Sequence, residues 1–166
     1  MAKNIGKGQR SQTVFARARR HAAIVAGVVV LAAAVVWPVR IVRAVEFVLI
    51  HNVKTGQTSV TKSELKDMSI GRRKTWSSGA PVQLVLQAVG TPEMKWFAVF
   101  AAGISDDTLA SKMKQEVFKG ELRRPITVTS DKSCVNAVAN DPGGMGVVSA
   151  ETAKSLPEGV AVLAVQ

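Results

Sequence analysis

The chain has 166 residues, of which 47% are hydrophobic and 5% aromatic, with 22 basic and 12 acidic side chains and a net charge of +10. This length suits one domain with a short appendage, and it excludes two full lobes around a cleft. The single cysteine, Cys134, excludes an intramolecular disulfide and a multi-cysteine zinc site, and two histidines argue against a histidine-based metal centre.

The excess positive charge is confined to the start of the chain. Residues 1–44 contain eight basic and no acidic side chains, whereas residues 45–166 contain 14 basic and 12 acidic ones. A nucleic-acid groove needs clustered lysine and arginine, with aromatic platforms if it binds single strands. Residues 45–166 show neither pattern, so we expect no nucleic-acid partner.

The N-terminal segment is expected to direct the chain to a membrane. Residues 1–21 form a basic leader, and residues 22–39 are an apolar run that would reach about 27 Å as a helix, against a hydrocarbon core of roughly 30 Å. The basic leader predicts a cytoplasmic N-terminus and a body delivered across the membrane, to the periplasm or the outer face of the inner membrane. Pro38 and the sequence Val42-Arg43-Ala44 agree with a cleaved signal peptide over 22–44, but the long leader agrees with a retained anchor. Both readings stay open.

Residues 45–166 alternate between strand and helix patterns. Thr61 and Glu64, three residues apart, are typical of a capping box at a helix start. The pattern predicts strands at 45–51, 81–88, 126–129, 145–149 and 160–165, and helices at 61–70, 93–102, 105–120 and 130–141. Strands that alternate with helices predict an α/β domain with a mainly parallel sheet covered on both faces, here preceded by one N-terminal hydrophobic helix.

Two stretches carry a family resemblance. The first is Ile70-Gly71-Arg72-Arg73-Lys74-Thr75-Trp76-Ser77-Ser78-Gly79, followed by Pro81 and a strand, and the second runs from Val117 to Val148 with Asp141-Pro142-Gly143-Gly144-Met145-Gly146 near its end. In this order they resemble the phosphate-type periplasmic substrate-binding proteins, above all their small single-domain members. The resemblance covers about residues 45–165. It implies a single-lobe, type 2 periplasmic-binding-protein-like domain, and a small oxyanion such as phosphate as the ligand.

The resemblance also implies where such an anion would bind. In the family, a Ser/Asp-Gly-Ser-Gly-Thr loop opens a helix and presents its N–H groups to the oxyanion. The corresponding residues here are 87–92, where one glycine and one threonine remain, the serines are absent, and Pro92 lacks an N–H group. Val147 stands where the family has a closing tyrosine. The implied contacts are Gly90, Thr91, Arg72, Arg73 and Ser130.

Each candidate also has a plain structural role to set against binding. Gly90 and Thr91 suit a strand-to-helix turn, Arg72 and Arg73 suit a solvated loop, and Ser130 suits a helix cap. Gly143, Gly144 and Gly146 are expected to serve a tight turn into a strand.

Nothing in the sequence predicts catalysis. His51 is the only histidine after residue 44, and Cys134 has the spacing of a buried helical residue. We therefore expect a non-enzyme without a cofactor or metal: an exported solute-binding-protein-like domain, tethered to the membrane if residues 22–44 are retained. The alternatives are a ligand-free interaction subunit that binds a partner protein at the membrane, and a homodimer that rebuilds a two-lobe cleft.

Overall fold

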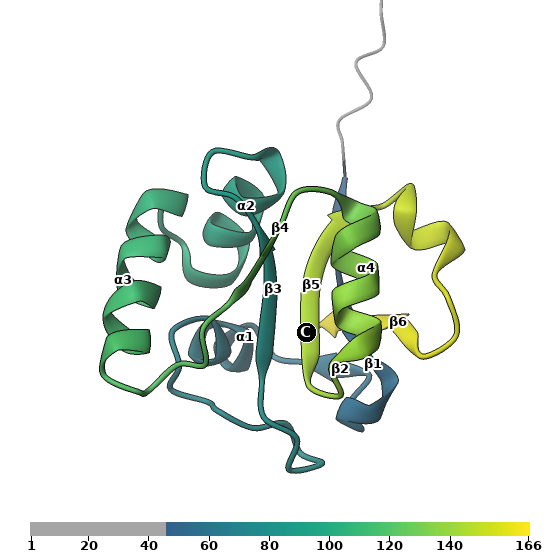
Figure 1. The fold of residues 1–166 in the computed structure, drawn as a ribbon, viewed down its shortest axis with the longest axis horizontal. Coiled ribbons are helices and arrows are strands. Elements are labelled where there is room, and N and C mark those ends of the chain that lie inside the picture. The colour runs from purple at the N-terminus through teal and green to yellow at the C-terminus, as the bar shows by residue number, and fades with distance from the viewer. Residues whose placement is uncertain (1–45) are drawn as a thin grey trace, which may run out of the picture. The chain divides into compact units, whose positions relative to one another are not determined.

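Helices flank both faces of a five-stranded sheet in the computed structural model, which describes residues 46–166 (Figure 1). The expected basic leader, 1–21, and the expected signal or anchor, 22–44, lie outside the described residues. Within residues 46–166, no helix has the length and apolar character needed to cross a membrane.

The strands and helices follow the predicted order along the chain. The strands of the main sheet are β1 (Phe47–Asn52), β3 (Gln83–Gln87), β4 (Ile126–Val128), β5 (Gly144–Ser149) and β6 (Val160–Val162), and a small second sheet pairs β2 (Ser59–Val60) with β7 (Ala164–Val165). The helices are α1 (Lys62–Ser69), α2 (Pro92–Phe97), α3 (Asp106–Phe118) and α4 (Asp131–Asn140), and a π-helical segment, Ala98–Ala102, continues α2. Short 3-10 turns cover Val53–Thr55 and Thr152–Ser155.

The main sheet has the strand order β4-β3-β5-β1-β6. Strand β3 is parallel to β4 and β5, so the expected mainly parallel sheet is confirmed. However, β1 runs antiparallel to both of its neighbours, with Leu49 opposite Val147 and Ile50 opposite Val162. The apolar pattern of β1 could not show this, because the same residues would be buried in either direction.

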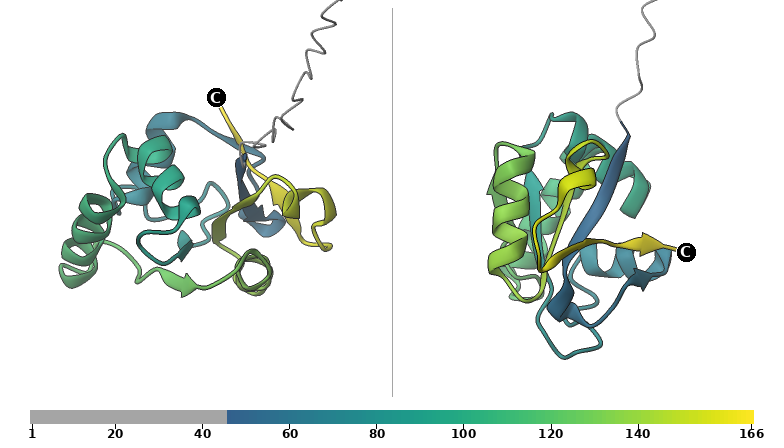
Figure 2. Two further views of the ribbon diagram at one scale, coloured as in Figure 1. Left: turned by 90° about the horizontal axis from the view of Figure 1, so that it is seen from above. Right: turned by 90° about the vertical axis from the view of Figure 1, so that its right-hand side faces the viewer.

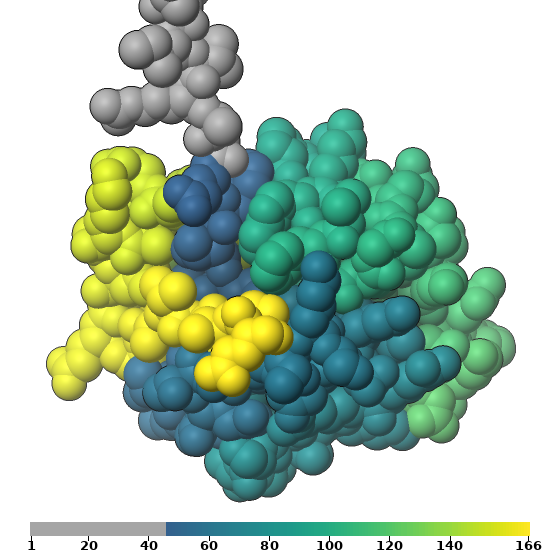
Figure 3. Space-filling model, turned by 180° about the vertical axis from the view of Figure 1, so that it is seen from behind, coloured from purple at the N-terminus to yellow at the C-terminus, as the bar shows by residue number. Residues whose placement is uncertain are grey.

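The predicted strand at 160–165 is two strands. Leu163 is buried at the break between them, and β7 turns away to pair in parallel with β2. Figure 3 shows this C-terminal segment, in yellow, beside the blue N-terminal strands. The backbone N–H of Lys62 donates to the carbonyl of Gln166 at 3.1 Å, so the last residue lies at the start of α1.

The helix starts follow from their capping residues. Glu64 donates its N–H to Thr61 Oγ1 at 3.1 Å and accepts the N–H of Thr61 at 2.8 Å, which confirms the capping box of α1. Ser130 forms a capping box with Ser133 at the start of α4, and Ser105 caps α3 by accepting the N–H of Thr108. Pro92 occupies the first turn of α2, where its missing N–H costs nothing.

Apolar side chains alternate between the two faces of the sheet. In β3, Leu84 and Leu86 belong to a large core beneath α1 and α2, whereas Val85 belongs to a smaller core beneath α4. Figure 2 shows α4 on one side of the sheet and α1 and α2 on the other. Trp76 joins the large core, and its indole N–H donates to the carbonyl of Gly143 at 2.9 Å.

Glycines just before β5 and within it allow close packing. A Cβ atom on Gly143 would lie 1.8 Å from the carbonyl oxygen of Pro81, and one on Gly146 would lie 2.5 Å from the sulfur of Cys134. Both distances are far below van der Waals contact. These glycines let α4 and the loop before β3 pack against β5. Gly143 lies in the turn before β5, as expected, whereas Gly144 and Gly146 belong to the strand itself, so the expected turn role is wrong for those two residues.

Candidate functional site

Three of the five residues proposed from sequence gather at one edge of the sheet. Gly90 and Thr91 follow β3, and Ser130 follows β4, which lies parallel to β3. Their strands therefore end at the same edge, where α2 and α4 begin (upper side of Figure 1). In open α/β sheets, ligands bind at this carboxyl edge.

Gly90 already has an internal anionic partner at this edge. Its φ of +93° favours glycine, and its backbone N–H donates to Oδ2 of Asp106 at 2.8 Å. Asp106 is the first residue of α3 and is 7% exposed. The carboxylate of Asp106 therefore already accepts the backbone N–H of Gly90, which the resemblance assigned to a bound oxyanion.

Thr91 acts as the N-cap of α2. Its hydroxyl accepts the N–H of Met94 at 3.3 Å and donates to the carbonyl of Ala88 at 2.8 Å. Both contacts are local, and Thr91 is half-buried. The Thr91 hydroxyl can still accept a further hydrogen bond, but its own proton is already donated to the carbonyl of Ala88.

Ser130 caps α4 together with Ser133. Their hydroxyls are 2.9 Å apart, and each accepts the N–H of the other residue, at 3.2 Å and 3.1 Å. The next two backbone N–H groups, on Asp131 and Lys132, belong to the first turn and have no acceptor inside the helix. These groups and the exposed side chain of Lys132 favour an anion at the start of α4.

Asp131 links three segments beneath this point. Its Oδ2 accepts the N–H of Ser149 at 2.9 Å, the hydroxyl of Ser149 at 2.7 Å and the hydroxyl of Thr152 at 2.8 Å, and its Oδ1 accepts from Gln87 at 3.0 Å. Burial raises the pKa of Asp131, but these hydrogen bonds outweigh it and hold the pKa below its ordinary value. Sequence spacing gave no signal of this role beyond the cap, because the donors come from distant parts of the chain.

The two arginines lie at the other end of β3. They belong to the loop before that strand, where the N–H of Val82 donates to the carbonyl of Lys74. Arg72 is largely exposed, and its guanidinium lies 4.0 Å from Asp67. The structure therefore does not bring Arg72 and Arg73 together with Gly90, Thr91 and Ser130.

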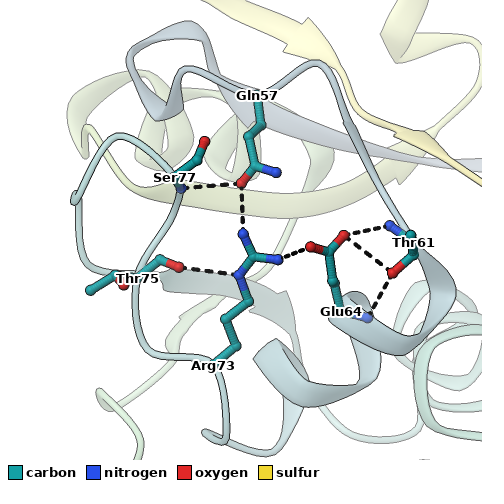
Figure 4. Close-up of polar contacts among 6 residues, drawn as sticks. All are labelled: Gln57, Thr61, Glu64, Arg73, Thr75 and Ser77. Carbon is teal, nitrogen blue, oxygen red and sulfur yellow. Dashed lines mark hydrogen bonds and ion pairs between the residues drawn. The ribbon is translucent and has the colours of Figure 1, made fainter.

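Arg73 holds the loop against α1 (Figure 4). Its guanidinium forms an ion pair with Glu64 and donates to the amide oxygen of Gln57 at 3.1 Å and to the carbonyl of Thr75 at 3.3 Å. The N–H of Thr61 and then Arg73 lower the pKa of Glu64. Local sequence could not show this, because Gln57 and Glu64 lie 16 and 9 residues away from Arg73.

The two chemically reactive side chains, those of Cys134 and His51, are both buried. Burial raises the pKa of Cys134 to about 12, so its thiol stays protonated at neutral pH. His51 is 2% exposed, and its Nδ1 lies 2.8 Å from the hydroxyl of Thr55. Among residues 46–166, no three His, Cys, Asp or Glu side chains form a group that could hold a metal ion.

Known structures share this fold. No protein-family model and no curated protein matches the sequence. Three solved structures are similar to it: PstS from Borrelia burgdorferi (17% identity, TM-score 0.53), a phosphate ABC transporter substrate-binding protein with bound phosphate from Clostridium perfringens (16%, 0.53), and a possible phosphate binding protein from Planctomyces limnophilus (14%, 0.55).

These matches concern only part of each neighbour. They cover 74%, 73% and 74% of this chain, but only 47%, 45% and 42% of the respective neighbours. The chain therefore matches less than half the length of each protein. The expected resemblance to phosphate-type substrate-binding proteins is confirmed for the fold.

Proposed function

We propose that residues 46–166 form a non-catalytic solute-binding lobe that takes a small oxyanion, phosphate first among them, at the carboxyl edge of the sheet. The observation that carries the proposal is the first turn of α4, which holds the free N–H groups of Asp131 and Lys132, the capping hydroxyl of Ser130 and the exposed side chain of Lys132. Gly90 and Thr91 follow β3 at the same edge of the sheet. Arg72 and Arg73 are not part of the proposed site.

The electrostatics of this turn favour an anion. Free N–H groups and the helix dipole together attract negative charge at a helix start. The carboxylate of Asp131 lies in the same turn, but four hydrogen bonds from Gln87, Ser149 and Thr152 already compensate it. The ammonium of Lys132 has no ion-pair partner in residues 46–166.

The proposed site is formed by a single lobe and is open to solvent on its other side, so we expect weak binding. A single lobe leaves the bound anion partly in water, where each charge-assisted hydrogen bond contributes less than in an enclosed site. We expect a Kd on the order of 1 mM, or about −4 kcal/mol. Two copies that face each other across the anion would bind more tightly, as the homodimer alternative requires.

The test is a phosphate titration of the full-length chain, followed by calorimetry at constant ionic strength. We expect phosphate and sulfate to bind and chloride not to, with Ser130→Ala and Lys132→Gln each weakening phosphate binding by about fivefold or more, which is ~1 kcal/mol. Ser105→Ala is the matched control, because it removes the same kind of cap from α3. No heat of binding, or equal affinity in all variants, would overturn the proposal.

A second candidate is a ligand-free interaction subunit at the membrane. It is favoured by the contact between Gly90 and Asp106, since a donor at the edge is already satisfied inside the protein. In this reading, residues 22–44 stay attached and hold the domain outside the cytoplasm. The intact mass of the native protein measures whether those residues are present, and a mass lacking residues 1–44 would exclude the tether.

A further inference from the structure

A groove lies between α3 and the edge strand β4, away from the start of α4. It has a volume of about 530 Å³ and opens to solvent. Its floor is formed by strand residues Leu86 and Thr127, and its wall by Met113, Val117 and Phe118 of α3. The main contacts of α3 are with α2 and the π-helical segment, so the helix stands beside the sheet edge and does not cover it.

The groove exposes apolar surface that the described chain does not cover. Phe118, at the end of α3, is 94% exposed, and Ile126 and Val89 beside the groove are 37% and 47% exposed. A phenylalanine that is almost fully exposed contributes little hydrophobic stabilisation to the fold. Burial against another molecule would remove its ring from water, which is favourable. This points to an occupant that supplies apolar side chains.

The edge of the sheet offers backbone hydrogen bonds to the same occupant. Within residues 46–166, β4 pairs with β3 alone, and its other side is open. An open strand edge presents unpaired N–H and C=O groups, which an extended peptide can satisfy by adding a strand.

The charges around the groove indicate which kind of partner would bind there. Lys114 and Arg124 line it, no acidic residue does, and neither cation forms an ion pair within the described part of the chain. A second copy docked edge to edge would bring these cations toward their own counterparts. Residues 1–44 of this chain are not expected to bind in the groove either, because they contain eight basic and no acidic side chains and would be repelled by its cations.

We propose that this groove binds an extended, acidic and apolar peptide segment of a partner protein. The segment adds a strand to β4, places apolar side chains against Phe118 and Met113, and brings a carboxylate to Lys114 and Arg124. This proposal is independent of oxyanion binding, since it uses neither Ser130 nor Lys132.

A selection experiment tests the proposal without a known partner. Random displayed peptides of about ten residues, the upper length of an ordinary strand, are selected on the immobilised full-length chain. We expect recovered peptides that combine Asp or Glu with alternating apolar residues. Their affinity should fall by about tenfold or more on Phe118→Asp and on Lys114→Glu, and Lys114→Glu should shift the preference toward basic peptides.

The controls separate this result from misfolding and from self-association. Lys112→Glu makes the same charge change on α3 outside the groove and should leave peptide binding unchanged. Phe118→Asp should melt like the parent chain, because the ring is exposed. The proposal is overturned if no recovered peptide distinguishes the parent from Phe118→Asp, if binding ignores Lys114→Glu, or if the parent self-associates and Phe118→Asp does not.

Discussion

The Oδ2 atom of Asp106 lies 2.8 Å from the backbone nitrogen of Gly90 and accepts its hydrogen. Asp106 begins α3 and Gly90 lies in the turn after β3, so one carboxylate connects the start of α3 to the edge of the sheet that holds the proposed anion site. The protein thus places a negative charge at the same edge of the sheet as the proposed anion site. Whether that charge limits anion affinity can be measured directly.

Asp106→Asn should strengthen phosphate binding. The asparagine oxygen can still accept the Gly90 N–H, but the repulsive charge is gone. The repulsion between the Asp106 carboxylate and a phosphate bound at this solvent-exposed edge is ~0.5–1 kcal/mol, and its removal corresponds to about a threefold gain in affinity. Calorimetry with phosphate measures it, and Asp107→Asn, an exposed change one residue along, is the control that should give a smaller gain. Weaker binding in Asp106→Asn would show that its charge does not oppose the anion.

Asp131→Asn should destabilise the fold at neutral pH by about 2 kcal/mol, because an amide cannot accept all the hydrogen bonds that Ser149, Thr152 and Gln87 donate to the carboxylate. The pKa of Asp131 is lowered in the folded state, so its contribution is complete above the unfolded pKa of about 3.9 and is lost as pH falls through the folded value. Urea unfolding at pH 7 and pH 3 measures the difference. A stability gap between parent and variant that stays constant at acid pH would contradict this account.

His51 should make the fold less stable as the medium becomes acidic. Burial lowers the pKa of His51 in the folded state, opposed in part by the Asn52 carbonyl, so the unfolded chain binds a proton more readily. Stability should be complete above the unfolded pKa of about 6.5 and fall below it, by at most about 1.4 kcal/mol per pH unit. Urea unfolding between pH 7.5 and 5.5 measures the slope. His51→Phe should flatten it, whereas His21→Gln, at the other histidine, should leave it intact.

Gly146→Ala should destabilise the protein by about 1–3 kcal/mol through overpacking, because the new methyl group would meet the Cys134 sulfur and the Val85 carbonyl oxygen. Cys134→Ala should remove the first clash but not the second. We therefore expect the double variant to be more stable than the sum of the single changes indicates, by about 0.5–1 kcal/mol. Chemical denaturation of the four proteins gives this coupling, and strict additivity would mean that the two side chains do not meet.

Local patterns along the sequence predicted the elements well. The Thr61–Glu64 capping box and the serine caps of α3 and α4 are interactions among near neighbours in sequence. The spacing of residues along the sequence is therefore enough to predict these caps.

The rest of the site depends on contacts that sequence spacing does not encode. The antiparallel direction of β1, the pairing of Gly90 with Asp106, and the attachment of Arg73 to α1 all join distant segments. Arg73 was assigned to the anion site because its charge suits an anion. The fold instead uses that charge for Glu64, at the end of β3 opposite Gly90.

The position of β1 in the sheet has a consequence for how the polypeptide acquires its fold. This strand comes first in the described chain, but it lies between β5 and β6, which come near the end. As the chain emerges during synthesis, β1 has no partner strand until residues 144–162 are available, and loop closure over such a separation is slow. The domain is therefore expected to stay unfolded and threadable until its synthesis is nearly complete.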